Sequence, residues 1–227
     1  MIKNVLIDYD GTLHDWDSVL KRSMDGMLGL SGEEFFHIWT YKIHRGLVHE
    51  SYLERHDDAM FHCKLLFDYL DMPFNEDVAG VICEKMEQAR IRAREDPIYF
   101  PEALEAVNRL ANQGIMICLS TGLDAIEKAK TFEAYAKRDF FSHVFSESLL
   151  GYLKTESEYY SRALEISGTE PFETTSIGDT PLSDIRPAKL VGIKTIWLNR
   201  RGEALPDDSE QVPHHQVKNL LEALKFL

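Results

Sequence analysis

The sequence predicts an α/β protein whose parallel sheet is covered by helices on both faces. Two observations indicate this class: five short apolar segments rich in strand-forming residues, and helical patterns between the last four of them. Helices that alternate with strands are typical of parallel sheets, because each helix carries the chain back across the sheet. The expected strands cover residues 4–8, 115–120, 143–146, 174–178 and 194–198.

The helical segments of this core carry recognisable end signals. One helix follows Pro101 and extends to Leu110, with Gly114 just beyond its end. Near the C-terminus, Val217, Leu220 and Leu224 have the spacing of an amphipathic helix that closes the core.

A second, all-helical domain is expected between the first two strands. Residues 16–96 have helical spacing and no strand pattern, and this segment is too long for one crossover helix. Residues 31–34, Ser-Gly-Glu-Glu, predict a capping box, and residues 52–70 predict a later helix. We therefore expect a core of residues 1–15 and 97–227 and a helical cap of residues 16–96.

Composition and charge limit the classes of partner. The 227 residues are 44% hydrophobic and 28% charged, as in ordinary globular proteins, and can bury a sizeable core. A net charge of -13 opposes binding to nucleic acids or anionic membranes, so we expect neither partner. The sequence does not predict an oligomeric state.

Cysteine usage and the N-terminal residues favour a cytoplasmic location. The three cysteines have no metal-binding spacing and suit a reducing compartment. The first ten residues do not resemble a secretory signal, and no apolar segment is long enough for a membrane helix.

Polar residues follow the expected strands where a parallel sheet binds ligands, at its carboxyl edge. Acids come from Asp8, Asp10, Asp179 and Asp184, hydroxyl groups from Ser120 and Thr121, and an ammonium from Lys154. Carboxylates, carbonyl oxygens and phosphate are ligands that Mg²⁺ prefers, so this set predicts magnesium-assisted phosphoryl transfer.

Two carboxylates in such a site need different protonation states. One attacks phosphorus, and the other protonates the leaving oxygen and later activates water. We expect Asp8, held by metal and Lys154, to stay ionised, and Asp10, close to other acids, to carry a proton more readily.

The motifs resemble those of the haloacid dehalogenase superfamily, in its branch of aspartate-nucleophile phosphatases with an inserted helical cap. The matching residues are Asp8-Tyr9-Asp10-Gly11-Thr12-Leu13, Ser120, Lys154, and Gly178-Asp179-Thr180-Pro181-Leu182-Ser183-Asp184. They occur in the order of the superfamily. Two departures are Thr155, where proline often follows the lysine, and Thr121, where asparagine is common.

The resemblance implies a Rossmann-like core and a role for each matching residue. Asp8 would be the nucleophile and a Mg²⁺ ligand, and Asp10 the acid/base and a ligand through its carbonyl. Asp179 would bind Mg²⁺, with Asp184 supporting the metal. Ser120 would bind the phosphoryl group and Lys154 would balance charge. We further expect Thr12, Thr121 and Gly122 to lie on the substrate side.

The expected cap offers weaker candidates. Arg45 could meet an anionic part of the substrate, although a solvated role is favoured. Five histidines of the cap, at positions 37, 44, 49, 56 and 62, match no zinc motif. Outside the cap, His14 closely follows the loop that carries Asp8 and Asp10.

The sequence therefore predicts a Mg²⁺-dependent phosphatase that acts through a phosphoaspartate on a small phosphorylated metabolite, such as a nucleotide, a sugar phosphate or phosphoglycolate. The cap would supply most of the selectivity. Alternatives are a phosphosugar mutase, a haloacid dehalogenase, and a regulatory module that accepts phosphate without turnover.

Overall fold

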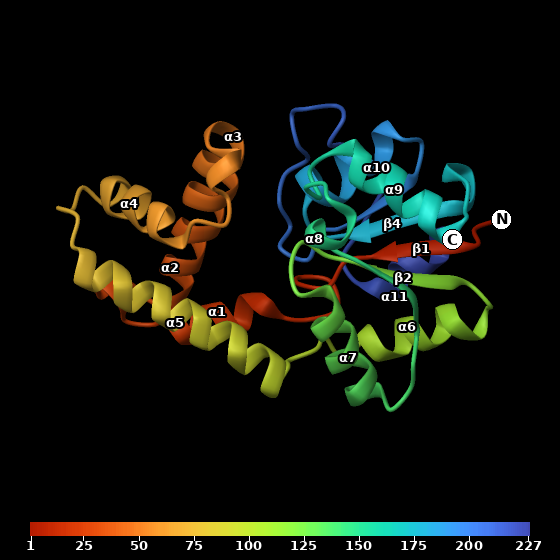
Figure 1. Ribbon diagram of the computed structural model, residues 1–227, viewed down its shortest axis with the longest axis horizontal. Helices are drawn as coiled ribbons and strands as arrows, with labels where there is room; N and C mark the ends of the chain where they lie inside the picture. Colours follow the sequence, from red (N-terminus) through yellow and green to blue (C-terminus); the bar gives the residue numbers. More distant parts are fainter. The chain divides into compact units, whose positions relative to one another are not determined.

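The computed structural model describes residues 1–227 and divides into two compact units (Figure 1). The core unit comprises Met1–Asp15 and Tyr99–Leu227, and the cap unit comprises Trp16–Ile98. None of the helices combines the length and the apolar character needed to cross a membrane.

The core unit is built on a parallel sheet of six strands in the order β3-β2-β1-β4-β5-β6. The strands are β1 (Asn4–Ile7), β2 (Met116–Ser120), β3 (Phe141–Phe145), β4 (Thr174–Gly178), β5 (Lys194–Leu198) and β6 (His215–Val217). The predicted parallel α/β class is confirmed. The sixth strand was not predicted, because its three residues give too short an apolar pattern to recognise.

Helices cover both faces of this sheet. They are α6 (Ala103–Asn112), α7 (Ala125–Ala136), α8 (Glu147–Leu150), α9 (Ser157–Ser167), α10 (Arg186–Leu190) and α11 (Leu220–Ala223), with shorter turns at Pro171–Glu173, Pro181–Ile185 and Leu224–Phe226. Helix α6 is the helix predicted after Pro101, and Gly114 follows it with a φ of 73°.

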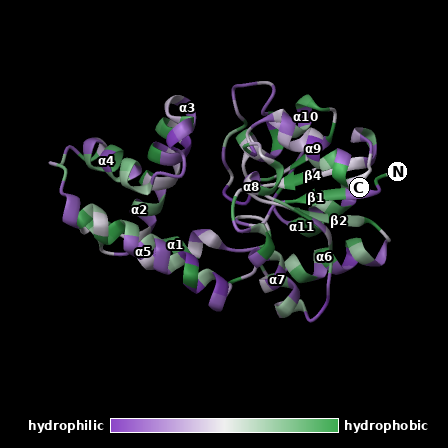
Figure 2. Ribbon diagram, in the orientation of Figure 1, coloured by the Kyte–Doolittle hydropathy of each residue, from purple (hydrophilic) through white to green (hydrophobic).

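The two faces of β1 belong to different clusters of the hydrophobic core. Val5 and Ile7 pack in one cluster with residues of α6, α7 and α11. Leu6 packs in the other with residues of α9 and α10. Side chains alternate along a strand, so an uninterrupted apolar segment such as β1 is buried on both faces. Figure 2 colours β1 and β2 mainly green for this reason.

The cap unit is helical, with no strand. Its helices are α1 (Trp16–Met24), α2 (Gly32–His37), α3 (His49–Ser51), α4 (Ala59–Tyr69) and α5 (Glu76–Glu95), with a π-helical segment at Ile38–Val48 and short 3₁₀ turns at Met27–Gly29 and Leu53–Arg55. Its own apolar core includes Phe35, Ile43, Leu66 and Ile82.

Local chemistry accounts for two helix starts in the cap. The predicted capping box begins α2: the Ser31 side chain accepts a hydrogen bond from Glu34 N, and the Glu34 carboxylate accepts one from Ser31 N. The helix predicted over residues 52–70 begins later than expected, at Ala59. The reason is Asp58, whose side chain accepts a hydrogen bond from Phe61 N and caps α4 there.

Candidate active site

The candidate site lies where the chain reverses its direction across the sheet. Successive strands run from β1 through β2 to β3 on one side, and β4 to β6 follow on the other side of β1. In open parallel sheets, ligands bind beyond the carboxyl ends of the strands at this switch point. Asp8 directly follows β1 and Asp179 directly follows β4, so the topology brings the two acids together.

Three buried carboxylates gather at this point. Asp8, Asp179 and Asp184 each offer a carboxylate oxygen within 4.8 Å of the others, and at most 7% of each residue is exposed. Lys154 Nζ lies 2.6 Å from Asp8 Oδ1 and 2.6 Å from Asp184 Oδ1. Arg201 Nη1 lies 2.8 Å from Asp179 Oδ2. The structure therefore unites four of the predicted site residues from separate segments of the core.

Burial controls the protonation of this cluster. It raises the pKa of Asp8 above its ordinary value, against the opposing charge of Lys154, and neighbouring Asp184 and Asp179 raise it further. Burial also raises the pKa of Asp184. The carboxylates raise the pKa of Lys154 well above its ordinary value although burial opposes this, so the ammonium stays charged.

This donor set fits a hard divalent cation. Carboxylate oxygens are the ligands that Mg²⁺ prefers, and three of them converge on one point. A bound cation would also favour the ionised carboxylates that burial disfavours. Asp8, Asp179 and Asp184 are therefore the residues that could hold a metal.

Two glycines allow the backbone to approach these acids closely. Gly11 has a φ of 81°, and a Cβ atom there would collide with the Asp179 carboxylate. A Cβ atom on Gly178 would collide with Asp184. The Asp184 carboxylate is fixed further by a hydrogen bond from Thr180 N at 2.9 Å, and Asp179 O accepts one from Trp197 Nε1 at 2.9 Å.

The Asp10 side chain has basic neighbours. His14 Nδ1 donates a hydrogen bond to its Oδ1 atom at 2.8 Å, and Lys128 Nζ lies 2.7 Å from its Oδ2 atom. Burial alone would raise the pKa of Asp10, but Lys128 and His14 lower it below its ordinary value. The expectation that nearby acids would help Asp10 to carry a proton is wrong for this structure, because its carboxylate faces two bases.

The predicted phosphate-binding residues lie at the end of β2 and in the loop after β1. Ser120 Oγ is 3.2 Å from the Tyr159 hydroxyl, which donates a hydrogen bond to Thr121 O at 3.3 Å. Thr121 Oγ1 accepts a hydrogen bond from Lys128 at 3.0 Å. Thr12 Oγ1 is buried and has no hydrogen-bond partner.

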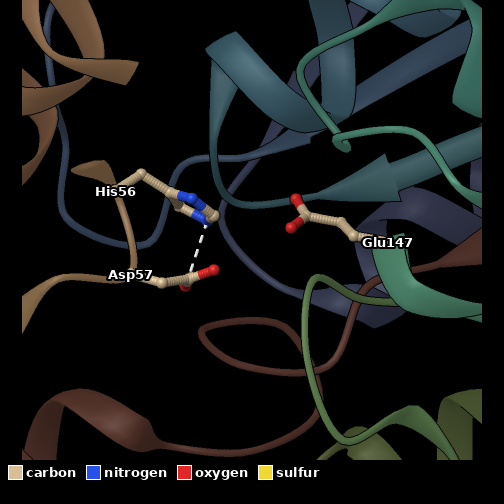
Figure 3. Close-up of side chains that lie close together, drawn as sticks. All are labelled: His56, Asp57 and Glu147. Atoms are coloured by element: carbon tan, nitrogen blue, oxygen red, sulfur yellow. Dashed lines mark ion pairs between the residues drawn. The ribbon is translucent and has the colours of Figure 1, made fainter. Parts of the chain in front are cut away.

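Glu147 connects this loop to the lysine segment. Glu147 N donates a hydrogen bond to Gly122 O at 3.1 Å, and its Oε1 atom accepts one from Lys154 N at 2.9 Å. Figure 3 draws this carboxylate, which projects from the start of α8. Glu147 thus holds the main chain at Lys154 close to the β2 loop, within the core unit.

Sequence reasoning missed several groups around the site. Arg200 donates hydrogen bonds to Gly11 O at 3.2 Å and Thr12 O at 2.9 Å, so it supports the loop after β1. Arg200 and Arg201 lie two and three residues after the end of a predicted strand, and this position could have identified them. Lys128 carried no signal, because a lysine on an amphipathic helix is usually solvated.

The cap candidates form a separate histidine cluster. His44 Nδ1 is 2.9 Å from His62 Nε2, and the rings of His44 and His49 are 4.3 Å apart. His56 Nε2 lies 3.3 Å from Asp57 Oδ1, the ion pair dashed in Figure 3. Arg45 lies in the π-helical segment, with its guanidinium 5.5 Å from the Tyr41 ring centre. A substrate role for Arg45 stays a prediction.

Comparisons with known proteins agree with this geometry. A family model described as haloacid dehalogenase-like hydrolase matches residues 2–192. A phosphoserine phosphatase of Thermus thermophilus is 30% identical over 162 residues, which cover 66% of this chain and 64% of the relative. A glyceraldehyde 3-phosphate phosphatase of Pyrococcus furiosus is 30% identical over 140 residues, covering 61% of this chain and 56% of the relative. The matched regions therefore span less than two thirds of either relative.

Solved structures share the fold over the whole chain. The HAD-hydrolase YfnB of Bacillus subtilis, solved bound to magnesium, superposes with a TM-score of 0.76. The alignment covers 100% of this chain and 98% of that one, at 20% identity. At this identity the likeness concerns the fold alone.

Proposed function

Because the chain belongs to the family of haloacid dehalogenase-like hydrolases, we propose that it hydrolyses phosphate monoesters of small metabolites with the help of Mg²⁺. One observation carries this proposal: Asp8, Asp179 and Asp184 meet beside Lys154 at the carboxyl ends of β1 and β4. The proposal assigns the nucleophile, the cation ligands and the compensating ammonium to these four neighbouring residues.

In the first step, a carboxylate oxygen of Asp8 attacks phosphorus, and the bond from phosphorus to the ester oxygen breaks. Asp10 must take up a proton before this step, because Lys128 and His14 favour its ionised form. It then gives that proton to the departing oxygen, which leaves as an alcohol. The product on the protein is an aspartyl phosphate. Lys154 supports this step, because its ammonium contacts Asp8 Oδ1 and keeps the carboxylate oriented.

In the second step, water attacks the phosphorus of the aspartyl phosphate. Asp10, now ionised, takes a proton from this water, and the bond between phosphorus and the Asp8 oxygen breaks. Inorganic phosphate leaves, the Asp8 carboxylate is regenerated, and Asp10 carries the proton from water that the next first step uses. The low pKa of Asp10 beside Lys128 and His14 suits the ionised form that this second step requires.

The transferring phosphoryl group needs positive charge and hydrogen-bond donors around its oxygens. Ser120, the N–H groups of the Asp8 and Ser120 loops, and Lys154 are the donors we assign. When bound by Asp8, Asp179 and Asp184, Mg²⁺ would supply Lewis-acid charge to the phosphoryl oxygens.

Phosphate release from p-nitrophenyl phosphate tests this function. We expect wild type to be active with Mg²⁺ and inactive with a chelator, and Asp8→Asn to be inactive in both conditions. Asp207→Asn is the matched control, because it removes an exposed carboxylate elsewhere in the core. Equal activity of wild type and Asp8→Asn would overturn the proposed mechanism.

The substrate class is part of the same proposal. The two relatives named above act, by their names, on small phosphate monoesters, which supports a small metabolite as the substrate here. A phosphate-release screen over nucleotides, sugar phosphates, phosphoserine and phosphoglycolate would identify it. Formation of an isomerised sugar phosphate with little free phosphate would instead indicate a mutase.

A cytoplasmic location is also proposed. The three cysteines, Cys63, Cys83 and Cys118, are free thiols, which supports a reducing compartment.

A further inference from the structure

Lys128 connects helix α7 to the proposed acid/base residue. It lies in the first turns of α7, and its Nζ atom is 2.7 Å from Asp10 Oδ2 and 3.0 Å from Thr121 Oγ1. The side chain is 16% exposed, so most of it is held by the protein. One ammonium therefore joins the loop after β1 to the loop after β2.

The second oxygen of Asp10 is held from another direction. His14 Nδ1 donates to Oδ1 at 2.8 Å, and the His14 side chain is only 1% exposed. Its ring stacks on Tyr9 with 5.4 Å between the ring centres, and its main chain bridges to Asp10 and Tyr99. His14 is thus a rigid partner, whereas Lys128 is the longer and more adjustable one.

We propose that Lys128 is a positioning residue that holds the Asp10 carboxylate toward the Ser120–Thr121 loop, where the leaving oxygen of the substrate would lie. This inference rests on the proposed phosphatase function. A carboxylate that moves a proton must be within hydrogen-bond reach of the ester oxygen, and a small misplacement is costly in rate. With both oxygens held, the Asp10 side chain is restricted to one orientation.

Two other roles for Lys128 make different predictions. A lysine that only binds the phosphate charge would affect all phosphate esters equally, because they carry the same phosphoryl group. A lysine that only stabilises α7 would change the unfolding temperature without selecting among substrates. A lysine that positions Asp10 matters most where the leaving group depends on a proton. Alkoxides have this dependence, and electron-poor phenolates lack it.

The test compares two esters in one set of variants. For Lys128→Met we expect kcat/KM for glycerol phosphate to fall about 10-fold to 100-fold, while that for p-nitrophenyl phosphate falls less than about 3-fold. Lys128→Arg should restore part of the alkyl activity. Lys130→Met, an exposed lysine on the same helix, should resemble wild type for both esters.

A background variant checks that the effect passes through Asp10. In Asp10→Asn, the further change Lys128→Met should alter the ratio of the two kcat/KM values by less than about 2-fold, because the proton carrier is already absent. Equal losses for both esters in Lys128→Met would overturn the inference. So would a persistent effect on the ratio in the Asp10→Asn background.

Folding and the proposed function are controlled separately. If Lys128→Met does not fold, Lys128→Gln replaces it, since an amide can still donate to Thr121 without a charge. Its expected pattern is the same preferential loss of alkyl activity, and equal losses again count against the inference. Activity in Asp8→Asn would refute the phosphatase mechanism itself, a result that is distinct from every outcome at Lys128.

Discussion

Acidification should destabilise the cap through its histidine cluster. Burial lowers the pKa of His44 from 6.5 to about 2 and that of His49 to about 4, and the neighbouring histidines and Arg45 act in the same direction. Both side chains therefore stay neutral in the folded cap at a pH where they would be charged in the unfolded chain.

The tautomers of this cluster follow from its hydrogen bonds. His62 Nδ1 donates to Asp58 O at 2.7 Å, because a carbonyl oxygen can only accept. His62 Nε2 must then accept in the neutral ring, so His44 Nδ1 donates to it at 2.9 Å. A proton added to His62 would remove this acceptor. Burial lowers the pKa of His62 as well, although Asp58 opposes the effect.

The magnitude follows from proton linkage. A group whose pKa is depressed in the folded state contributes its full stability above the unfolded pKa, and this contribution is lost as the pH falls toward the folded pKa. Between these two pKa values, each such histidine lowers the free energy of unfolding by ~1.4 kcal/mol for every unit by which the pH falls. Between pH 7 and pH 5, His44 and His49 should each cost about 2 kcal/mol at most.

Urea unfolding at several pH values measures this slope. Trp39 stacks on His62, with 5.4 Å between ring centres, so tryptophan fluorescence includes a reporter in the cluster. We expect the pH slope of the double variant His44→Gln, His49→Gln to be clearly smaller than that of wild type. His37→Gln, an exposed histidine of the same unit, is the control and should keep the wild-type slope. An unchanged slope in the double variant would show that His44 and His49 do not cause the loss of stability on acidification.

Three further changes test the packing and the metal site. Gly11→Ala should cost ~1–2 kcal/mol for the left-handed backbone and should also displace Asp179, so calorimetry should show weaker Mg²⁺ binding; unchanged affinity would contradict the close approach. Asp179→Asn should reduce Mg²⁺ affinity at least about 10-fold in calorimetry, and wild-type affinity would remove Asp179 from the donor set. Phe35→Ala in the cap core should lower the free energy of unfolding in urea by ~3–5 kcal/mol, because Phe35 is fully buried. Phe172→Ala, at a residue that is 73% exposed, should change it by no more than ~0.5 kcal/mol, and similar losses in both variants would contradict the burial of Phe35.

Much of the core could be predicted because its signals are local and strong. The segments of β1, β4 and β5 are buried on both faces and rich in apolar or β-branched residues, so the sequence identifies them nearly to the residue. The rule for carboxyl ends of parallel strands then groups Asp8 with Asp179 without any coordinates. Local sequence is therefore sufficient to predict a site residue that directly follows a recognisable strand.

The parts that could not be predicted depend on contacts between distant segments. Lys128 is an ordinary helical lysine until the fold places it beside Asp10, 118 positions earlier in the chain by sequence number. The protonation of Asp10 depends on such contacts too, because the sequence shows the acids near it but not that its carboxylate faces Lys128 and His14. The π-helical segment Ile38–Val48 has no composition that separates it from an α-helix.

The proposed mechanism requires that Asp8 forms a covalent bond to phosphorus during turnover. Rapid quenching during turnover, followed by borohydride reduction, would convert an aspartyl phosphate into homoserine, and peptide mass analysis would locate the change. We expect this modification at Asp8, dependent on substrate and Mg²⁺, and its loss in Asp8→Asn. Steady phosphate release by wild type with no reduced residue at position 8 would contradict it.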